Sequence, residues 1–334
     1  IGARKVTYIL SGVLVLIGIL GVNPHIMGKL NLGIDFSGGR NYIIRFAEPV
    51  NTQEVNAALD NVFMEAKSEL ADEETFALNV ITIGDANQVR VSTNYRINDN
   101  SETLDDEIEA LLYEGCKQFL PENVTLKEFT STDINPEIGI MQSQKVGPAI
   151  ADDITQSAVW AVLAALLGIF LYVLLRFRNF SFSVGALAGL AHNTLIVLGA
   201  YALLWKVMPF SMEIDQSFIA AILTVIGYSI NDTVVIFDRV REYTGLYPKR
   251  ARKQNINDAL NQTLSRTFST SMSTLVVLIA IFCFGGETIR GFVFALIIGV
   301  VVGTYSSLCV ATPLAYDIQE ALDRRKAKKA ALNK

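Results

Sequence analysis

Residues that bind metals or act as nucleophile–base pairs are scarce in this sequence. Its 334 residues include three cysteines and two histidines, and their spacing is not that of a metal site. Cys283 and Cys309 fall in apolar runs, so Cys116 is the single thiol of the polar segment and cannot form an internal disulfide there. His25 has no recognisable nucleophile or orienting acid in sequence. An enzyme is therefore the interpretation that we favour least, and we expect no metal and no cofactor.

An even mixture of polar and apolar residues is also missing. The chain is 51% hydrophobic, and much of this excess lies in six runs close to the roughly 20 residues that span a bilayer as a helix. We therefore predict six transmembrane helices with a large polar domain between the first two. The first run follows Arg4 and Lys5 but lacks a small-x-small cleavage site, so we interpret it as a retained helix.

The runs give a division of the whole chain. We predict spans at residues 1–23, 156–176, 182–205, 214–238, 267–285 and 290–313. The remaining segments are a polar domain at 24–155, a loop with an amphipathic helix at 239–266, and a basic tail at 314–334.

Positive charge is scarce in the polar domain. Residues 24–155 carry 23 acidic and 9 basic residues, so 9 − 23 = −14, whereas the rest carries 10 and 19, so 19 − 10 = +9. The basic residues flank the apolar runs, as at Arg4, Arg176, 239–266 and the tail. Because such loops stay in the cytoplasm, we predict a multi-pass membrane protein with cytoplasmic termini and an exported domain, which in a bacterium is periplasmic or extracytoplasmic. Anionic lipid explains the basic segments better than nucleic acid does.

The polar domain has a readable order of elements. Residues 42–46 alternate like a strand, a capping box at Asn51 and Glu54 begins a helix, and 78–83 with 88–93 indicate a hairpin. A second helical pattern covers 104–119, and 124–129 is predicted to be the last strand. This order, β-α-β-β-α-β, is that of an α+β ferredoxin-like fold.

Glycine-containing turns mark both ends of this domain. In Leu32–Gly39, the pair Gly38 and Gly39 permits positive φ and close backbone approach, with Asp35 just before them. A plain turn is an equal alternative, and no Lys-Ser/Thr pair makes the segment a phosphate loop. Val146-Gly147-Pro148 precedes the second span and indicates a hinge or a simple linker.

The fourth apolar run carries the most unusual residues. Asn231 and Asp232 lie inside it, and a carboxyl group there costs about 2.5–3.5 kcal/mol on insertion scales, so such residues usually mark ion or proton paths. Tyr228 lies four residues before Asp232 and shares its helical face. Arg266 opens the fifth run on the same side and could favour the ionised acid. The alternatives are an acid that only holds helices together and an arginine that only anchors a loop.

Other polar residues interrupt the apolar runs. His192 and Asn193 indicate either a proton relay or, our preferred interpretation, a hydrogen bond between packed helices. Hydroxyl side chains recur at 269–274 and 304–307, where they could line a polar seam or support packing.

Several motifs together resemble one known family. Leu32–Gly39, Val146-Gly147-Pro148, and the segments 227–239, 261–267 and 303–307 stand in the order found in the SecF family of protein-export membrane proteins. The six spans and single large exported loop are similar as well. The segment 227–239 is the specific one, whereas Gly-Gly and Gly-Pro alone are weak signals.

The resemblance implies a function and its partners. It implies a non-enzymatic subunit that works with SecD, separate or fused, and assists the SecYEG channel in late steps of export, driven by the proton gradient. It implies a membrane domain similar to half of a resistance-nodulation-division pump, and an exported domain that holds unfolded polypeptide. It places the family's proton-linked acid and arginine at Asp232 and Arg266. The absence of an initiator Met suits the SecF half of a fused SecDF and equally a trimmed chain.

Two other functions remain open at this stage. A resistance-nodulation-division-type exporter of small molecules or lipids would need a gated cavity in the exported domain, and such pumps usually carry larger exported regions. A structural scaffold would tolerate neutral replacement of Asp232 and Arg266. Sodium is an alternative to protons, since Asp232, Asn231 and nearby hydroxyls could bind it.

Overall fold

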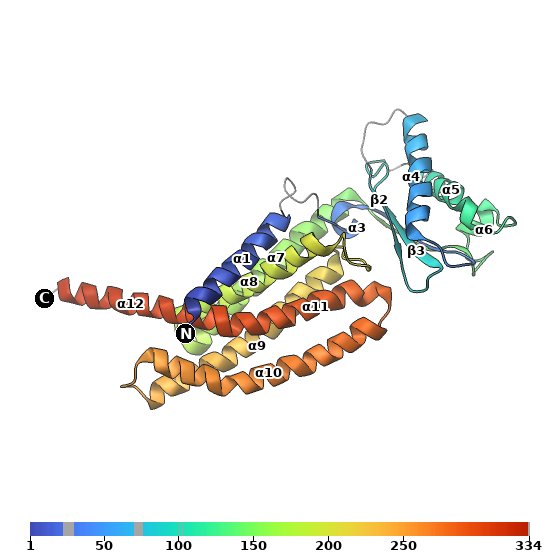
Figure 1. Cartoon of the computed structure of the whole chain (residues 1–334). Helices are drawn as coiled ribbons and strands as arrows, with labels where there is room; N and C mark the ends of the chain where they lie inside the picture. Colours follow the sequence, from blue (N-terminus) through green and yellow to red (C-terminus); the bar gives the residue numbers. More distant parts are fainter. Residues whose placement is uncertain (23–29, 70–75, 100, 102, 333–334) are drawn as a thin grey trace.

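A bundle of long helices carries a small α/β domain at one end (Figure 1). The computed structural model describes residues 1–22, 30–69, 76–99, 101 and 103–332. His25, considered above as a catalytic residue, lies outside the described residues. Both termini lie at the end of the bundle far from the α/β domain (Figure 1).

Six helices in the described part of the chain are long and apolar enough to cross a membrane. This agrees with the number predicted from the apolar runs. They are α1 (Arg4–Val22), α7 (Pro148–Phe177), α8 (Phe180–Leu204), α9 (Gln216–Leu246), α10 (Arg252–Phe284), and α11 (Glu287–Ser306) with its continuation.

The helices extend beyond the predicted spans. Helix α9 continues to Leu246, and α10 begins at Arg252, so the amphipathic segment expected within 239–266 is the first part of the fifth helix. Its apolar face is partly covered, since Ile256 and Ala259 are buried whereas Leu264 is 48% exposed. At the other end α7 begins at Pro148, directly after the sheet.

The last long helix is interrupted by one wide turn. Residues Ser307–Ala311 form a π-helical turn between α11 and α12 (Thr312–Leu332). The Thr312 hydroxyl donates to the Ser307 carbonyl, 2.8 Å away, across this turn. Such turns inside helices are rare and occur often at functional sites.

A four-stranded antiparallel sheet forms the other domain, which we call the sheet domain (residues 34–146). The order in space is β2-β3-β1-β4. Its strands are β1 (Gly39–Arg45), β2 (Leu78–Thr82), β3 (Gln88–Thr93) and β4 (Gly139–Val146). Ile44 pairs with Val89 of β3 and Val80 pairs with Val91, so apolar residues of neighbouring strands share one face.

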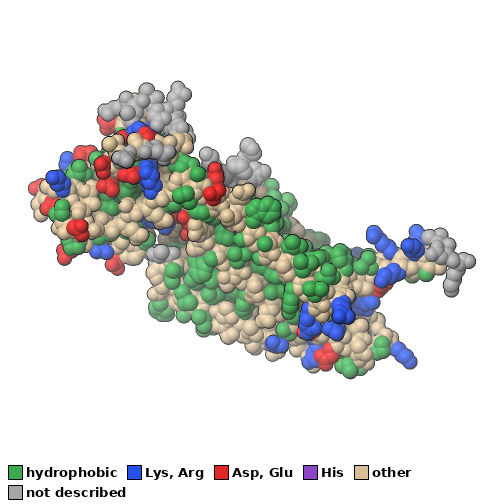
Figure 2. Space-filling model, turned by 180° about the vertical axis from the view of Figure 1, so that it is seen from behind, with side chains coloured by type: hydrophobic (Ala, Val, Ile, Leu, Met, Phe, Trp, Pro, Cys, Tyr) green, Lys and Arg blue, Asp and Glu red, His purple; other side chains and the backbone are tan. Residues whose placement is uncertain are grey.

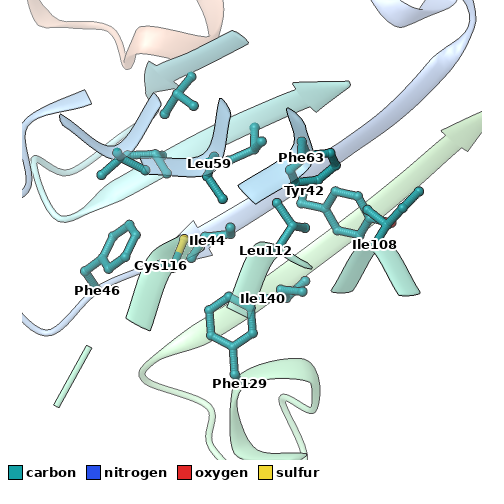
Figure 3. Close-up of a cluster of buried hydrophobic side chains, with 14 of the residues drawn as sticks. Tyr42, Ile44, Phe46, Leu59, Phe63, Ile108, Leu112, Cys116, Phe129 and Ile140 are labelled. Atoms are coloured by element: carbon teal, nitrogen blue, oxygen red, sulfur yellow. The ribbon is translucent and has the colours of Figure 1, made fainter. Parts of the chain in front are cut away.

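Helices α4 (Thr52–Glu69) and α5 (Leu104–Cys116) pack together against this face. Their Leu59, Phe63 and Leu112 meet Tyr42 and Ile44 of β1 in the core (Figure 3). Each large side chain buried here contributes about 1.5–3 kcal/mol. The predicted hairpin and both predicted helices of this domain are therefore present.

The last predicted strand is wrong. Residues Leu126–Thr130 form the short helix α6, because the Thr125 side chain and Glu128 make a capping box. Phe129 reaches the core from this helix. The fourth strand is instead β4, at the edge of the sheet, where Gln142, Ser143 and Gln144 are exposed. Its polar sequence lacks the alternation that predicts strands.

The surface separates charge from apolar side chains. In Figure 2 acidic side chains gather over the sheet domain, basic side chains gather at the opposite end of the bundle, and hydrophobic side chains cover the region between. Large exposed apolar residues of the long helices include Leu167 of α7 and Phe268 of α10, at 58% and 60% exposure. A water-exposed surface of this kind is unfavourable, whereas a bilayer covers it.

Candidate functional site

Asp232 lies in the interior of the helix bundle. It is a residue of α9, and its side chain is 5% exposed. The buried face of α9 combines apolar residues with Ser229, Asp232 and Thr233, and this helix packs against α8, α10 and α11. The acid is therefore held between helices rather than against lipid.

Asp232 belongs to a group of polar side chains that are buried in the bundle or hydrogen-bonded between its helices, and we call this group the polar seam. The seam comprises Asn193 of α8, Ser229, Asp232 and Thr233 of α9, Thr267 and Ser271 of α10, Thr304 of α11, and Ser307 of the π turn.

Short hydrogen bonds connect the seam across helix boundaries. Asn193 donates to the Ser229 hydroxyl at 2.8 Å, and the Thr233 and Ser307 hydroxyls are 2.8 Å apart. The Asn193 bond joins α8 to α9, as the packing interpretation predicts for that residue. Within the part of the chain that the structure describes, the His192 ring is bonded only to Asn193 of its own helix, at 3.3 Å, so it makes no such bond between helices.

The hydroxyl-rich fifth run also contributes. The Ser271 hydroxyl is 2.6 Å from the Thr304 hydroxyl of α11. It is also close enough to interact with the Asp232 side chain. Ser269 and Ser273, from the same run, are exposed. One face of the run thus lines the seam and the other does not, as the helical period requires.

The seam is not fully satisfied. Among the described residues, Asp232 Oδ2, Thr267 Oγ1 and His192 Nε2 are buried without a hydrogen-bond partner. An unpaired buried polar group costs about 1–3 kcal/mol, more when it is charged. A fully bonded amide would hold the helices together at lower cost, so packing alone does not explain why a carboxyl group stands here.

Arg266 is placed one helix away from the acid. It lies on α10 on an exposed surface, close enough for its charge to act on Asp232. The described ion pairs do not include these two residues, so the contact is electrostatic rather than direct. Tyr228 donates to Thr274 at 3.2 Å, and Asn231 is exposed on the outer side of α9.

The Leu32–Gly39 segment meets the beginning of the helix that carries Asp232. Gly33 donates its backbone N–H to the Ile214 carbonyl at 3.0 Å, and Ile214 donates to Asn31 at 2.8 Å. The Asp35 carboxylate accepts the backbone N–H of Gln216, the first residue of α9, at 3.2 Å. Acidic groups are stabilised at a helix N-terminus, so Asp35 acts as a cap supplied by another part of the chain.

The paired glycines fix how the chain enters the sheet. A short helix, α3 (Ile34–Ser37), ends at Gly38, whose φ is +68°, and Gly39 opens β1 with φ of +137°. A Cβ at Gly39 would lie 2.5 Å from the Thr93 carbonyl oxygen of β3. Both positions therefore require glycine, by conformation and, at Gly39, by space.

One ion pair was missed in the sequence. Arg90 of β3 binds Glu213, in the connection between α8 and α9, at 2.7 Å. The side chain of Glu213 is 7% exposed. Its neighbours in sequence are apolar, and this could have indicated that Glu213 is buried. Its partner could not be predicted, because Arg90 lies 123 residues away in the sequence.

Comparison with known families decides the relationship. Residues 126–321 match the family described as protein export membrane protein SecD/SecF, C-terminal, which covers more than half of the chain. Residues 28–50 match the SecD/SecF GG motif, the segment that contacts the start of α9. The chain belongs to the SecD/SecF family.

Relatives of this family cover nearly the whole chain. The "Protein translocase subunit SecF" of Rhodothermus marinus is 39% identical over 317 residues, which cover 95% of this chain and 91% of the relative. The subunit of the same name from Thermodesulfovibrio yellowstonii is 35% identical over 318 residues, covering 94% and 92%.

Solved structures of SecDF have the same fold. The SecDF of Thermus thermophilus, described as a translocon-associated membrane protein, is 30% identical with a TM-score of 0.73. The match covers 96% of this chain and 38% of that chain. A SecDF in a super-membrane-facing form matches with a TM-score of 0.59 at 30% identity, over 98% and 39%. This SecD/SecF chain thus spans well under half of those SecDF chains.

Proposed function

We propose that this chain is a SecF-type accessory subunit of the Sec protein translocase. With SecD it uses the proton gradient to promote late steps of protein export across the cytoplasmic membrane. Family membership and relatives named as translocase subunits over most of the chain support this proposal. It acts as a coupling subunit rather than an enzyme.

The protein is a multi-pass inner-membrane protein in this proposal, with cytoplasmic termini and an exported sheet domain. Basic side chains at the end of the bundle that carries both termini support this orientation (Figures 1 and 2). The strand order β2-β3-β1-β4 with two helices on one face supports a ferredoxin-like sheet domain. The bundle is then half of a membrane domain like that of resistance-nodulation-division pumps.

The observation that best supports this proposal is that Asp232 is buried and that one of its oxygens has no hydrogen-bond partner among the described residues. Protonation of Asp232 removes a charge from a low-dielectric interior, where an ionised carboxylate is expensive. Release of the proton restores the charge and its attraction to Arg266. Because α9 contacts α8, α10 and α11 at this level, the change alters which arrangement of these helices is favoured. Tyr228, which bonds Thr274 of α10, borders the path on the same helix, whereas Asn231 faces outward and is not part of it.

The partners follow from the same proposal. SecD covers part of the outward helix surface, as the longer SecDF chains suggest by their additional length. SecYEG supplies the channel, unfolded polypeptide meets the sheet domain, and anionic lipid binds the basic residues at the cytoplasmic end. An exporter of small molecules or lipids is not favoured, because the relatives are named as translocase subunits.

Translocation into sealed vesicles tests the role of Asp232. Vesicles would carry SecYEG, SecD and either the wild type or Asp232→Asn, and export of an unfolded substrate would be measured with and without a proton gradient. We expect the variant to retain basal export and to lose most of the gradient-dependent part. Asp238→Asn is the matched control, because Asp238 lies on the same helix in an exposed ion pair with Arg176, where little energy is at stake.

Two outcomes would count against this mechanism. Full gradient-dependent export by assembled Asp232→Asn complexes would remove the acid from the coupling step. If a sodium gradient alone drove export equally well, the coupling ion would be sodium rather than the proton. Arg266→Gln should weaken coupling less than Asp232→Asn, because its contact with the acid is electrostatic.

A further inference from the structure

A second covered acid joins the two domains of the molecule. Glu213 accepts from Arg90 of β3 at 2.7 Å and from Asn79 of β2 at 3.3 Å. Arg90 also donates to the Ser211 hydroxyl at 3.3 Å. We call these four residues the clasp. Two come from the sheet and two from the connection between α8 and α9, so the clasp exists only while the domains are in contact.

The clasp is largely withdrawn from solvent. The Glu213 and Arg90 side chains are 7% and 17% exposed. A cavity of about 30 Å³ lies beside them, lined in part by Ser211, Asp215 and Gly291. That space is about enough for one water molecule, which could carry a proton to Glu213 without opening the joint.

The position of the clasp links it to α9. Ile214, next to Glu213, is bonded through its backbone to Asn31 and Gly33. Asp215 then caps α9 by accepting from Phe218 at 2.8 Å. The clasp is thereby connected through the chain and its hydrogen bonds to the first turn of the helix that bears Asp232.

The charges around Glu213 do not balance in favour of its ionised form. Burial raises the pKa of Glu213; the Arg90 cation opposes this effect, and the nearby Asp215 carboxylate adds to it. Asp35 of α3 lies beside Gln216 in the same region. Helix α11 has Arg290 in its first turn and contributes Gly291 and Phe292 to the lining of the cavity. The net result is a pKa above the usual value of 4.5.

The sign of the pH effect follows by linkage. A carboxyl group whose pKa is higher in the docked joint than in free solvent binds its proton more tightly when docked. Docking is therefore most stable at acidic pH, and this stabilisation is lost as the pH rises through the raised pKa. An ionised Glu213 is the form that favours separation, because solvent then hydrates the carboxylate that the joint covers.

We propose that Glu213 is a second proton-binding site, and that its protonation holds the sheet domain against the membrane helices. The site is separate from Asp232 and lies at the end of the bundle near the sheet domain. On the orientation proposed above, it faces the side that the proton gradient acidifies. An acid exterior then closes the joint, and loss of the proton loosens it.

Distance measurements between the domains test this proposal independently of export. Spin labels would be placed at Met64→Cys on α4 and Val207→Cys after α8, both exposed at 51% and 74%, with Cys283 and Cys309 replaced by alanine. The full chain in lipid nanodiscs would be examined by pulsed electron resonance between about pH 5 and pH 8. The wild type should give one narrow distance at acidic pH and a broader, longer distribution at alkaline pH.

Variants identify the group responsible. Glu213→Gln mimics the protonated acid and keeps the Asn79 and Arg90 contacts, so it should stay docked at every pH. Arg90→Gln removes the opposing cation, so the midpoint should move upward by about one pH unit or more. Glu107→Gln is the matched control: Glu107 pairs with Arg96 at 2.9 Å within the sheet domain, and its variant should retain the wild-type response.

The contrary results are equally definite. An unchanged wild-type distance across this pH range would show that the joint does not respond to protons. A wild-type pH response in Glu213→Gln, or an unmoved midpoint in Arg90→Gln, would assign the response to another group. None of these results depends on Asp232, so the proposed function stands or falls by its own export assay.

Discussion

Asp232 and Asp105 are both acids in contact with other elements, but their surroundings differ. Asp105 is bound by Arg40 at 2.6 Å and by Lys145 at 3.2 Å. Asp232 has one oxygen buried without a partner. The first acid has its bonds supplied by the fold, whereas the second keeps one oxygen without a partner in the part of the chain that the structure describes. Satisfaction of hydrogen bonds, rather than burial alone, separates the structural acid from the candidate functional one.

Asp105→Asn should destabilise the sheet domain. Arg40 is 3% exposed and already has one unpartnered nitrogen, Nη2, so loss of the carboxylate leaves a buried cation without its counter-charge. We expect a loss of roughly 1–3 kcal/mol, toward the lower end because Asp105 itself is partly exposed. Urea unfolding followed by tyrosine fluorescence would measure it. Glu114→Gln, in an exposed pair with Lys117, should change stability far less.

The Arg40–Asp105 pair also predicts that the stability of the sheet domain depends on pH. Partial burial alone would raise the pKa of Asp105, but the bonds from Arg40 and Lys145 outweigh it and hold the pKa below the usual 3.8. The stabilisation is therefore complete above that value and is lost as pH falls through the lowered pKa. The Asn variant should show a flatter stability profile at acidic pH; parallel profiles would exclude this contribution.

At the scale of elements, the junction between α3 and β1 is set by backbone geometry. Gly39→Ala should cost about 1–3 kcal/mol from conformational strain, with a further cost because its Cβ meets the Thr93 carbonyl. Thermal unfolding or limited proteolysis of the sheet domain would measure the loss. Gly84→Ala is a matched control, since Gly84 also has positive φ, +72°, but open space around its Cβ position. Equal losses would show that crowding at Gly39 is unimportant.

The elements that could be predicted are those in which apolar residues recur with a regular spacing because one face is buried. The number of apolar helices and the 78–93 hairpin follow hydrophobic burial, and both agree with the structure. Strand β4 was not, because its outer residues 142–145 are polar and exposed and give no period of two. Helix α6 was mistaken for a strand because five residues are too few to show the helical period of 3.6.

The candidate site was only partly accessible from sequence. Asp232 was evident because a carboxyl group in an apolar run is rare. The identity of its neighbours depends on how α8, α9, α10 and α11 pack, and no local pattern encodes that. Ser229 and Thr233 resemble ordinary small residues of a membrane helix until Asn193 and Ser307 are placed beside them. Arg90 and Glu213 are further from prediction still, since they belong to different domains.

For the whole molecule, the arrangement of charge predicts which parts face each side of the membrane. Met64→Cys in the sheet domain should react with a membrane-impermeant maleimide in intact cells from which the outer membrane has been removed. Lys249→Cys, between α9 and α10, should react only after the inner membrane is opened. Both require Cys283 replaced by alanine. Cys116 needs no replacement, because burial raises its pKa to about 12 and leaves it unreactive.

Labelling of both sites from the outside, or of neither, would contradict the proposed orientation. The reverse pattern would place the acidic domain in the cytoplasm, and the proton-binding site at Glu213 would then face the alkaline side. The experiment thus also determines the direction in which a gradient acts on the clasp.

The π turn at Ser307–Ala311 changes which side chains of the last helix face its neighbours α8 and α9. Each residue added to a helix turns it by about 100°, so one extra residue in this turn rotates everything that follows relative to α11. Before the rotation Ser307 faces Thr233 of α9, and after it Ala311 and Ala315 lie against Gly185 of α8. Chain length here is consequently as constrained as residue type. Deleting one amino acid between 307 and 311 would swing the small side chains of α12 away from α8 and bring bulkier ones into a space that has no room for them.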